Sequence, residues 1–288
     1  MPTRSGRQKQ FSKWWKRSHS KPLFTLPQGD IFCGDALDFL NTLKEESADI
    51  IFLDPPFNLG KRYGKRGAKA DLIANDDYLE YLSSVLERAA SVLKKGGALY
   101  LYHIPRWAFR LANVLEQHLT FRHWIAISMK NGFVRGMSLY PAHYSLLYFT
   151  KGEPRYFKRP KLPPSRCRHC NEYIKDYGGY KDFVKKGINL SDFWEDLSPV
   201  RHKKFKHRKP NELPLEIPRR VVTVSGRRGG VLVDPFAGSG ASLVAAVEGG
   251  MKFVGCDSQQ SYCRLMNNRI KRLAVKPPKQ KRRDARKK

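Results

Sequence analysis

Residues 231–246, VLVDPFAGSGASLVAA, run from a short apolar stretch through a glycine-containing turn into a series of small and apolar residues. This order predicts a strand, a tight turn and a helix. Gly238 and Gly240 allow the backbone to approach a ligand closely, and the start of the helix offers free N–H groups. Many turns of this kind carry two glycines only for packing, so the segment alone is a weak sign of a binding site.

The next expected strand, FVGCD, ends in Asp257, seventeen residues after Gly240. A carboxylate at this position of an α/β unit can accept hydrogen bonds from both hydroxyls of a ribose, although it can also cap the helix that follows. Together, the turn and the acid favour an adenosine-containing cofactor. A nicotinamide dinucleotide fits less well, because its usual turn has a third glycine where this chain has Leu243.

Strand patterns and helical periodicities alternate along the rest of the chain, which predicts an α/β fold with a mainly parallel sheet. The continuous apolar run ADIIFL (48–53) is typical of a strand that is buried on both faces. Helical spacing of apolar residues predicts a helix over 76–97 that stops at Gly96-Gly97. We expect seven strands, two of which, 123–130 and 144–151, form an antiparallel hairpin.

The chain is strongly basic, with a formal net charge of +29 over 288 residues. The terminal segments 1–21 and 276–288 each contribute +7, so the residues between them still carry +15. Such an excess favours a polyanionic partner, most commonly nucleic acid, although basic tails can also serve solubility alone. We therefore treat 1–28 as a basic N-terminal arm and 276–288 as a basic C-terminal tail.

The cysteines and the apolar runs bear on the cellular setting. No apolar run approaches the ~20 residues of a membrane-spanning helix, so no membrane partner is expected. The five cysteines do not form the pattern of a disulfide framework, which favours a reducing, cytoplasmic setting. Cys167 and Cys170, with His202 and His207 downstream, allow a four-ligand zinc site, but a reduced thiol pair is the alternative and we assign no metal. Cys33 is expected to be a small buried residue.

The stretch IIFLDPPFN (50–58) ends a strand in two prolines, which stop the ladder because neither has a backbone N–H. Asp54 and the Pro55 carbonyl are two acceptors that can hold both hydrogens of an exocyclic amino group. The nitrogen lone pair is then available to attack an electrophilic methyl group, a transfer that depends on positioning and electrostatics. Phe57 can offer a face for base stacking. For this stretch alone, a Pro-Pro turn with the ring in the core is the alternative.

LDPPFN resembles the catalytic D/N/S-P-P-Y/F motif of DNA amino-methyltransferases, and DPFAGSG resembles their S-adenosylmethionine motif, FxGxG. The catalytic motif comes first, as in the permuted beta class, in which the target-recognition region lies between the two motifs. The resemblance covers roughly residues 29–272. It implies a Rossmann-like methyltransferase fold, S-adenosylmethionine as cofactor, double-stranded DNA as partner, and a target base that leaves the duplex.

The resemblance also implies roles for individual positions. The target-base pocket would be formed by Asp54, Pro55 and Phe57, with Pro56 shaping it. The methionine end of the cofactor would be held by Asp234, Phe236, Gly238 and Gly240. Asp257 would bind its ribose, and Asp35 would lie near its adenine.

The domain organisation follows from the same resemblance. Residues 29–150 would form the catalytic half of the methyltransferase domain, and 207–275 the cofactor half. Between them, 151–206 would be a basic target-recognition insert. Residues 207–214 resemble the segment that packs over the methionine moiety of the cofactor.

The identity of the motif residues bears on the target base. An aspartate at position 54 favours adenine N6, whereas Phe57 weakens this preference because adenine-modifying members more often have tyrosine there. We expect methylation of adenine N6 in DNA. Cytosine N4 is the first alternative, followed by RNA methylation and by a non-catalytic nucleic-acid binder. The recognition sequence and the oligomeric state, a homodimer included, stay open.

Overall fold

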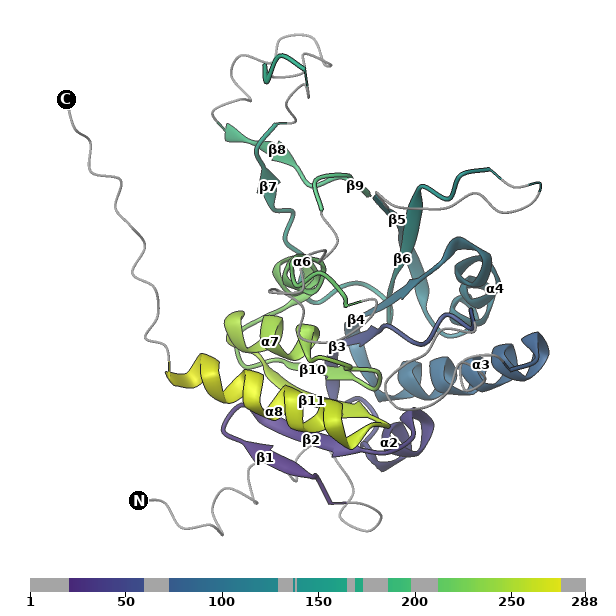
Figure 1. Ribbon diagram of the computed structural model, residues 1–288, viewed down its shortest axis with the longest axis vertical. Coiled ribbons are helices and arrows are strands. Elements are labelled where there is room, and N and C mark those ends of the chain that lie inside the picture. Colours follow the sequence, from purple (N-terminus) through teal and green to yellow (C-terminus); the bar gives the residue numbers. More distant parts are fainter. Residues whose placement is uncertain are drawn as a thin grey trace, which may run out of the picture.

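The computed structural model describes residues 21–59, 73–128, 137, 139–164, 169–172, 186–197 and 212–275. Within these residues, one mixed sheet of nine strands has the order β1-β2-β11-β10-β3-β4-β6-β5-β9 (Figure 1). The strand bounds are β1 Phe24–Leu26, β2 Gly29–Cys33, β3 Ala48–Leu53, β4 Leu93–His103, β5 Thr120–Ser128, β6 His143–Thr150, β9 Phe193–Trp194, β10 Val231–Asp234 and β11 Lys252–Asp257.

The central run β2-β11-β10-β3-β4 is parallel, and β9 pairs parallel with β5 at one edge. Strand β6 pairs antiparallel with both β4 and β5, which confirms the predicted hairpin. The expectation of seven strands was too low. Strands β1 and β9, which pair with β2 and β5, extend the sheet at its two edges. They have only three and two residues, too few for a periodic pattern in the sequence.

Strand β9 comes from the stretch that the sequence assigned to a recognition insert. The side chain of Trp194 is only 2% exposed and belongs to the hydrophobic core that also contains residues of the last three helices that the structure describes. The guanidinium of Arg220 lies 5.1 Å from the centre of its ring and forms two hydrogen bonds with Asp196. This end of the stretch is therefore anchored to the main domain. Strands β7 (Lys161–Leu162) and β8 (Ile188–Asn189) form a separate two-stranded ladder.

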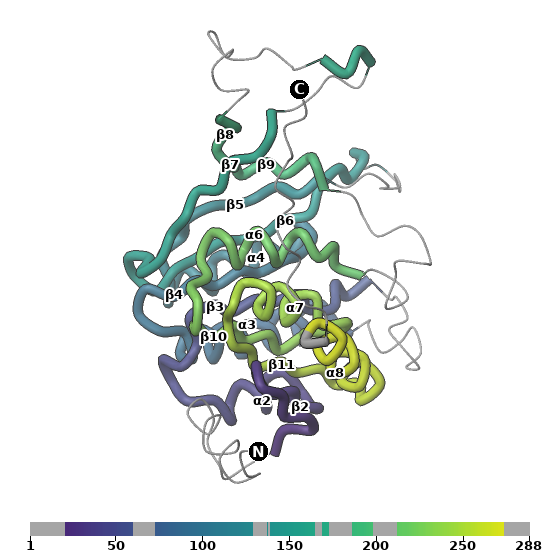
Figure 2. The backbone as a smooth tube through the Cα atoms, turned by 90° about the vertical axis from the view of Figure 1, so that its left-hand side faces the viewer, coloured from purple at the N-terminus to yellow at the C-terminus, as the bar shows by residue number. Residues whose placement is uncertain are grey.

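Helices cover both faces of the sheet, as the predicted alternation requires. One face carries α2 (Ala36–Thr42), α3 (Asn75–Val92) and α4 (Pro105–Glu116). Figure 2 looks onto the other face, which α6 (Glu216–Ser225), α7 (Ala241–Glu248) and α8 (Gln260–Val275) cover. Each helix layer packs its apolar residues against the sheet face beside it, which gives two hydrophobic cores, one on each side of the sheet. The central strands are therefore buried on both faces.

The junction of α3 and β4 differs from the expectation that Gly96-Gly97 stops a helix. Helix α3 ends at Val92 and β4 begins at the next residue. The Gly96 N–H donates to the Lys151 carbonyl at 2.7 Å, and the Lys151 N–H donates to the Gly97 carbonyl at 3.1 Å. Gly96 also has a φ of +74°, which favours glycine. Both glycines thus belong to the strand, because pairing with the end of β6 outweighs the local helical pattern.

Asp49 joins three neighbouring strands at the amino end of the parallel sheet. Its carboxylate accepts hydrogen bonds from the Val231 N–H at 2.9 Å and from Lys94 Nζ at 2.6 Å. Arg227 Nε lies 3.1 Å from the other oxygen. Burial opposes ionisation, but the bonds to Lys94 and Val231 and the Arg227 charge outweigh it and lower the pKa of Asp49. The buried carboxylate is therefore a stabilising connection between β3, β4 and β10.

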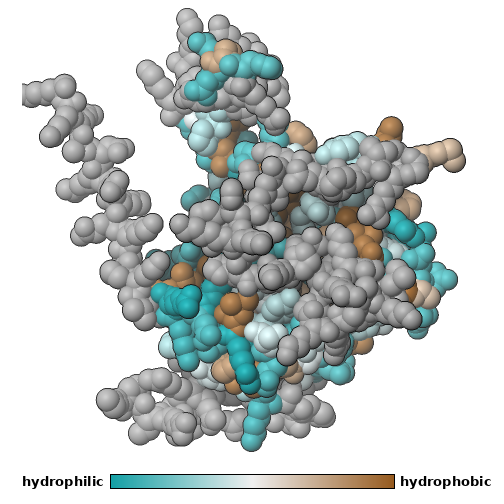
Figure 3. Space-filling model, in the orientation of Figure 1, coloured by the Kyte–Doolittle hydropathy of each residue, from teal (hydrophilic) through white to brown (hydrophobic). Residues whose placement is uncertain are grey.

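The surface of the cofactor half is partly basic. Hydrophilic residues lie over α8 in Figure 3, and its exposed side chains include Arg264, Asn268, Lys271 and Arg272. None of the helices in the described ranges is long and apolar enough to cross a membrane.

Candidate functional site

The predicted site residues meet at the carboxyl edge of the parallel strands. Asp54 follows β3, Asp234 ends β10, Asp257 ends β11, and Asp35 lies two residues beyond β2. These strands are neighbours in the order β2-β11-β10-β3, so the tertiary fold places the four acids along one edge. Ligands of open α/β sheets bind at this edge.

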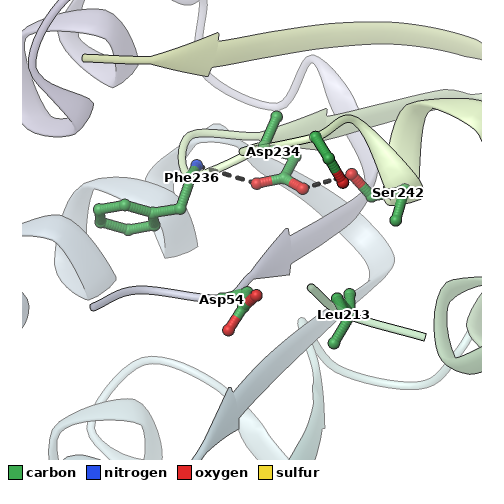
Figure 4. Close-up of a pocket in the computed structure, with 8 residues that line it drawn as sticks. Asp54, Leu213, Asp234, Phe236 and Ser242 are labelled. Carbon is green, nitrogen blue, oxygen red and sulfur yellow. Dashed lines mark hydrogen bonds between the residues drawn. The ribbon is translucent and has the colours of Figure 1, made fainter. Parts of the chain in front are cut away.

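One pocket at this edge contains residues of both motifs (Figure 4). Asp54 and Leu213 face Asp234 and Ser242 across it. The lining consists of Asp54, Leu213, Asp234, Phe236, Ala237, Ser239, Ala241 and Ser242. The structure thus brings together the first residue of the DPPF motif and two predicted cofactor residues, Asp234 and Phe236.

Asp234 is held in a fixed orientation at the base of this pocket. One of its carboxylate oxygens accepts a 2.9 Å hydrogen bond from the Phe236 N–H, and the other accepts one from the Ser242 hydroxyl. Burial raises the pKa of Asp234 to about 7, and the negative charges of Asp54 and Asp257 contribute in the same direction. A cationic group in the pocket would favour the ionised form of these acids.

The glycine turn after β10 has the backbone that its sequence predicts. Gly238 and Gly240 have φ values of +51° and +80°, in the region that favours glycine. A Cβ on Gly240 would lie 2.9 Å from Cγ of Met266, a side chain of α8. The shape of the turn and its packing on α8 therefore both require glycine at position 240.

Asp257 and Asp35 have defined hydrogen bonds at the next two strands. Asp257 accepts from the Gly238 N–H at 3.1 Å and from the Gln259 N–H at 2.8 Å, so it does act as a local cap. Asp35 caps α2 through the Leu37 N–H at 2.7 Å. Its other oxygen accepts a 2.7 Å hydrogen bond from the hydroxyl of Tyr81, whose pKa is raised by burial and by this bond.

The aromatic residue of the DPPF motif lies in the core. Phe57 is 6% exposed, and its ring centre lies 4.9 Å from that of His103, 6.0 Å from Tyr102 and 5.8 Å from Tyr144. Burial and, secondarily, the Asp54 charge raise the pKa of Tyr144. Tyr144 thus lies within electrostatic reach of the proposed catalytic acid, and the buried ring of Phe57 offers little surface for base stacking in this conformation.

Two buried side chains to which the sequence assigned no role at the site, Tyr78 and Trp107, contact the motif backbone, and His103 contacts the first of them. The Tyr78 hydroxyl donates to the Pro56 carbonyl and lies 2.7 Å from His103 Nε2. The Trp107 Nε1–H donates to the Phe57 carbonyl at 3.2 Å. In the sequence, Tyr78 and Trp107 only occupy apolar positions of helices, so no local signal marks these contacts.

Asn58, immediately after the motif, is also a structural residue. It has a φ of +52°, and its side-chain amide donates to the Ile73 carbonyl and accepts from the Ile73 N–H, both at 3.0 Å. This two-bond pairing joins the motif to the residues that precede α3.

The part of the 207–214 segment that the structure describes contacts the glycine turn. Leu213 lines the pocket, and Glu212 Oε1 accepts a 3.2 Å hydrogen bond from the Ser239 hydroxyl. Arg269 of α8 lies 3.4 Å from the same oxygen and donates to the Ser239 carbonyl at 3.1 Å. Glu212 and Arg269 therefore fasten this segment and the turn to α8.

The zinc hypothesis falls mostly outside the described residues, which exclude Cys167, His202 and His207. Cys170 is described and exposed. Within the described ranges, no group of three or more His, Cys, Asp or Glu side chains could hold a metal ion. Cys33 was expected to be buried but is exposed, at the last residue of β2, where the strand gives way to the turn before α2.

Comparisons with known proteins identify the family. Residues 48–268 match the family model described as DNA methylase, N6/N4 type. Type II methyltransferase M.BamHI from Bacillus amyloliquefaciens is 40% identical over 253 residues, which are 87% of this chain and 59% of that protein. Type II methyltransferase M.HpaI from Haemophilus parainfluenzae is 29% identical over 247 residues, 83% of this chain and 73% of that protein.

Solved structures support the fold. The M1.HpyAVI–SAM complex superposes with a TM-score of 0.58 at 18% identity, covering 84% of this chain and 98% of that one. PvuII DNA methyltransferase, described as cytosine-N4-specific, has a TM-score of 0.60 at 18% identity, with 87% and 89% covered. The predicted methyltransferase fold is confirmed, and S-adenosylmethionine is the methyl donor of the matched family. The chain belongs to the N6/N4 DNA methylase family.

Proposed function

We propose that this chain transfers a methyl group from S-adenosylmethionine to an exocyclic amino group of a base in double-stranded DNA. The observation that carries the proposal is the shared pocket of Asp54 and Asp234, which belong to the catalytic and the cofactor motif. Family membership and the basic composition of the chain support DNA as the substrate.

The chemistry of the pocket fits the proposed cofactor. S-adenosylmethionine carries a sulfonium and an ammonium group, and it supplies an electrophilic methyl group. Burial and, secondarily, the charges of Asp54 and Asp257 raise the pKa of Asp234, in a chain whose net charge is strongly positive. A cationic ligand relieves the repulsion among these acids. We assign the methionine end to Asp234, Phe236, Gly238 and Gly240, the ribose to Asp257, and the adenine end to Asp35.

The proposed reaction needs two acceptors at the target amino group. Asp54 and the Pro55 carbonyl hold the two amino hydrogens, so that the nitrogen lone pair is directed at the methyl group. The nitrogen–methyl bond would form as the sulfur–methyl bond breaks, S-adenosylhomocysteine would leave, and the methylated amino group would pass one proton to water. The base reaches Asp54 only outside the duplex, so base flipping is part of the proposal.

The preferred target is adenine N6, because the motif begins with aspartate. One observation keeps cytosine N4 as the second candidate: the motif ends in Phe57, where adenine-modifying members more often have tyrosine. The two products differ in the nucleoside that carries the methyl group.

The deciding experiment incubates the full chain with methyl-labelled S-adenosylmethionine and unmethylated duplex DNA. The DNA is then digested, and the modified nucleoside is identified by mass spectrometry. N6-methyldeoxyadenosine supports adenine N6 as the target, and N4-methyldeoxycytidine supports cytosine N4. Label on parallel RNA alone, or no label at all, contradicts the proposed function.

A further inference from the structure

His103 is a buried histidine at the end of β4 whose two ring nitrogens are both engaged. Its Nδ1 accepts a 2.9 Å hydrogen bond from the Ile104 N–H, and its Nε2 lies 2.7 Å from the Tyr78 hydroxyl. The residue is 0% exposed, and burial lowers its pKa to about 3. The ring is therefore neutral near neutral pH. Because Nδ1 is an acceptor, the single ring proton resides on Nε2.

The proton on Nε2 sets the direction of the next hydrogen bond. His103 donates to the Tyr78 oxygen, so the Tyr78 hydroxyl proton points to another acceptor, which is the carbonyl of Pro56. The result is a chain that runs from the imidazole through the phenol to the backbone of the DPPF motif. Tyr78 is 4% exposed, and its bond to His103 is buried, whereas its bond to the Pro56 carbonyl is partly buried.

A second buried donor holds the following residue of the motif. The Trp107 Nε1–H donates to the Phe57 carbonyl at 3.2 Å, and the Trp107 and Tyr78 ring centres are 4.7 Å apart. Two successive motif carbonyls are thus held by side chains of α3 and α4. Neither bond uses the Asp54 carboxylate or the Pro55 carbonyl, the two proposed acceptors for the target amino group.

We propose that Tyr78 and His103 are positioning residues for methyl transfer, acting as one hydrogen-bonded chain that fixes the Pro56 peptide and thereby aims Asp54 and the Pro55 carbonyl. This inference rests on the proposed function. The chain touches neither substrate nor cofactor, so its loss should change the rate of transfer and leave binding intact. Misplacement of catalytic groups by about 1 Å can cost ~100-fold in rate.

The main test compares Tyr78→Phe with wild-type protein under single-turnover conditions and in steady state. The variant keeps the ring and its packing on Trp107 but removes the hydroxyl. We expect kcat to fall by roughly 10- to 100-fold, with less than about a twofold change in KM for DNA and in the Kd for S-adenosylmethionine. A kcat equal to that of the wild type, or a loss confined to KM, overturns the inference.

Tyr100→Phe is the matched control. Tyr100 is also a buried tyrosine in the sheet region, 1% exposed, and its hydroxyl lies 2.7 Å from the Ser225 hydroxyl, apart from the motif. Its loss should lower the thermal midpoint to a similar extent and leave kcat unchanged. Equal losses of kcat in both variants would mean general destabilisation and would overturn the positioning role.

Variants at His103 test the hydrogen-bonded chain without changing Tyr78, and comparing two of them separates a lost hydrogen bond from a failure to fold. His103→Gln can retain a donor near the Nε2 position and should keep most of kcat, whereas His103→Leu should resemble Tyr78→Phe. Combining His103→Leu with Tyr78→Phe should add little further loss, because both break the same chain. Additive losses, or equal activity of the glutamine and leucine variants, contradict the inference.

Two further readouts separate this inference from the proposed function. Absence of methylation by the wild-type protein overturns both, whereas an active wild type with an unaffected Tyr78→Phe variant overturns only the positioning role. Imidazole ¹⁵N spectra should show a neutral His103 with its proton on Nε2 at neutral pH. A protonated ring, or the other tautomer, also overturns the inference.

Discussion

The backbone N–H of Gly238 donates a 3.1 Å hydrogen bond to Oδ2 of Asp257. The bond joins the glycine turn after β10 to the acid that ends β11. Oδ1 of the same carboxylate accepts from the Gln259 N–H at 2.8 Å, so both oxygens are oriented. A ribose bound here would meet a carboxylate whose orientation is already fixed, which lowers the entropy cost of binding.

Asp257→Ala should therefore weaken the binding of S-adenosylmethionine by roughly 10- to 100-fold, the effect of losing hydrogen bonds to a charged group. Duplex DNA should bind with less than about a twofold change. Titration calorimetry with each ligand measures both effects. Asp257→Asn, which keeps an acceptor for Gly238, should lose less affinity. Similar losses for cofactor and DNA would contradict the ribose role.

Asp54→Ala should reduce methyl transfer by at least about a hundredfold, because one of two acceptors for the amino group is removed. Binding of DNA and of S-adenosylmethionine should be largely retained, since the side chain acts mainly as the reaction proceeds. Single-turnover rates and equilibrium binding measure the two effects. Retained activity would refute the proposed role of Asp54.

Asp234→Asn should change how stability depends on pH. The pKa of Asp234 is raised from 3.8 to about 7, chiefly by burial. The folded protein thus holds a proton that the unfolded chain has released, and stability falls as pH rises through this range. The wild-type thermal midpoint should fall more than that of Asp234→Asn between about pH 5 and about pH 7.5. Parallel curves would contradict a raised pKa. The variant should also bind S-adenosylmethionine more weakly.

Asp49→Asn should destabilise the fold by about 2 kcal/mol at neutral pH, because it breaks charge-assisted bonds to Lys94 and Arg227. The pKa of Asp49 is lowered from 3.8, so its contribution is present above that value and is lost as pH falls below it. Urea unfolding at neutral and acidic pH measures the difference. Glu45→Gln, which removes an exposed carboxylate 3.6 Å from the largely buried Arg88, is the control and should change stability by less than ~1 kcal/mol. An equal effect of both variants would contradict a special role for Asp49.

Deleting residues 276–288, which carry eight Lys/Arg and one Asp, should weaken DNA binding by a similar factor for every sequence. Contacts between basic side chains and phosphates are independent of sequence and depend on salt. The slope of log K against log salt should therefore become shallower. Fluorescence anisotropy over a salt series measures this slope. An unchanged slope would show that the tail does not contact DNA.

Local sequence patterns determined the α/β class, the two motifs and most strands of the sheet. The continuous apolar run of β3, the glycines of the turn after β10 and the proline pair after Leu53 each constrain the backbone through local physics. Burial of the strand on both faces, the positive φ of the glycines and the missing N–H groups of the prolines are each set by a few neighbouring residues. These features are therefore readable without knowledge of the fold.

The tertiary structure decided what is built from residues distant in the chain. Parallel pairing of β3 and β10 places Asp54 beside Asp234, and pairing with β6 takes Gly96 and Gly97 into β4. Tyr78 and His103 look like ordinary core residues in the sequence, and only the packing of α3 against β4 places the Tyr78 hydroxyl between His103 and the Pro56 carbonyl. Such contacts depend on long-range geometry, so no local pattern in the sequence could have predicted them.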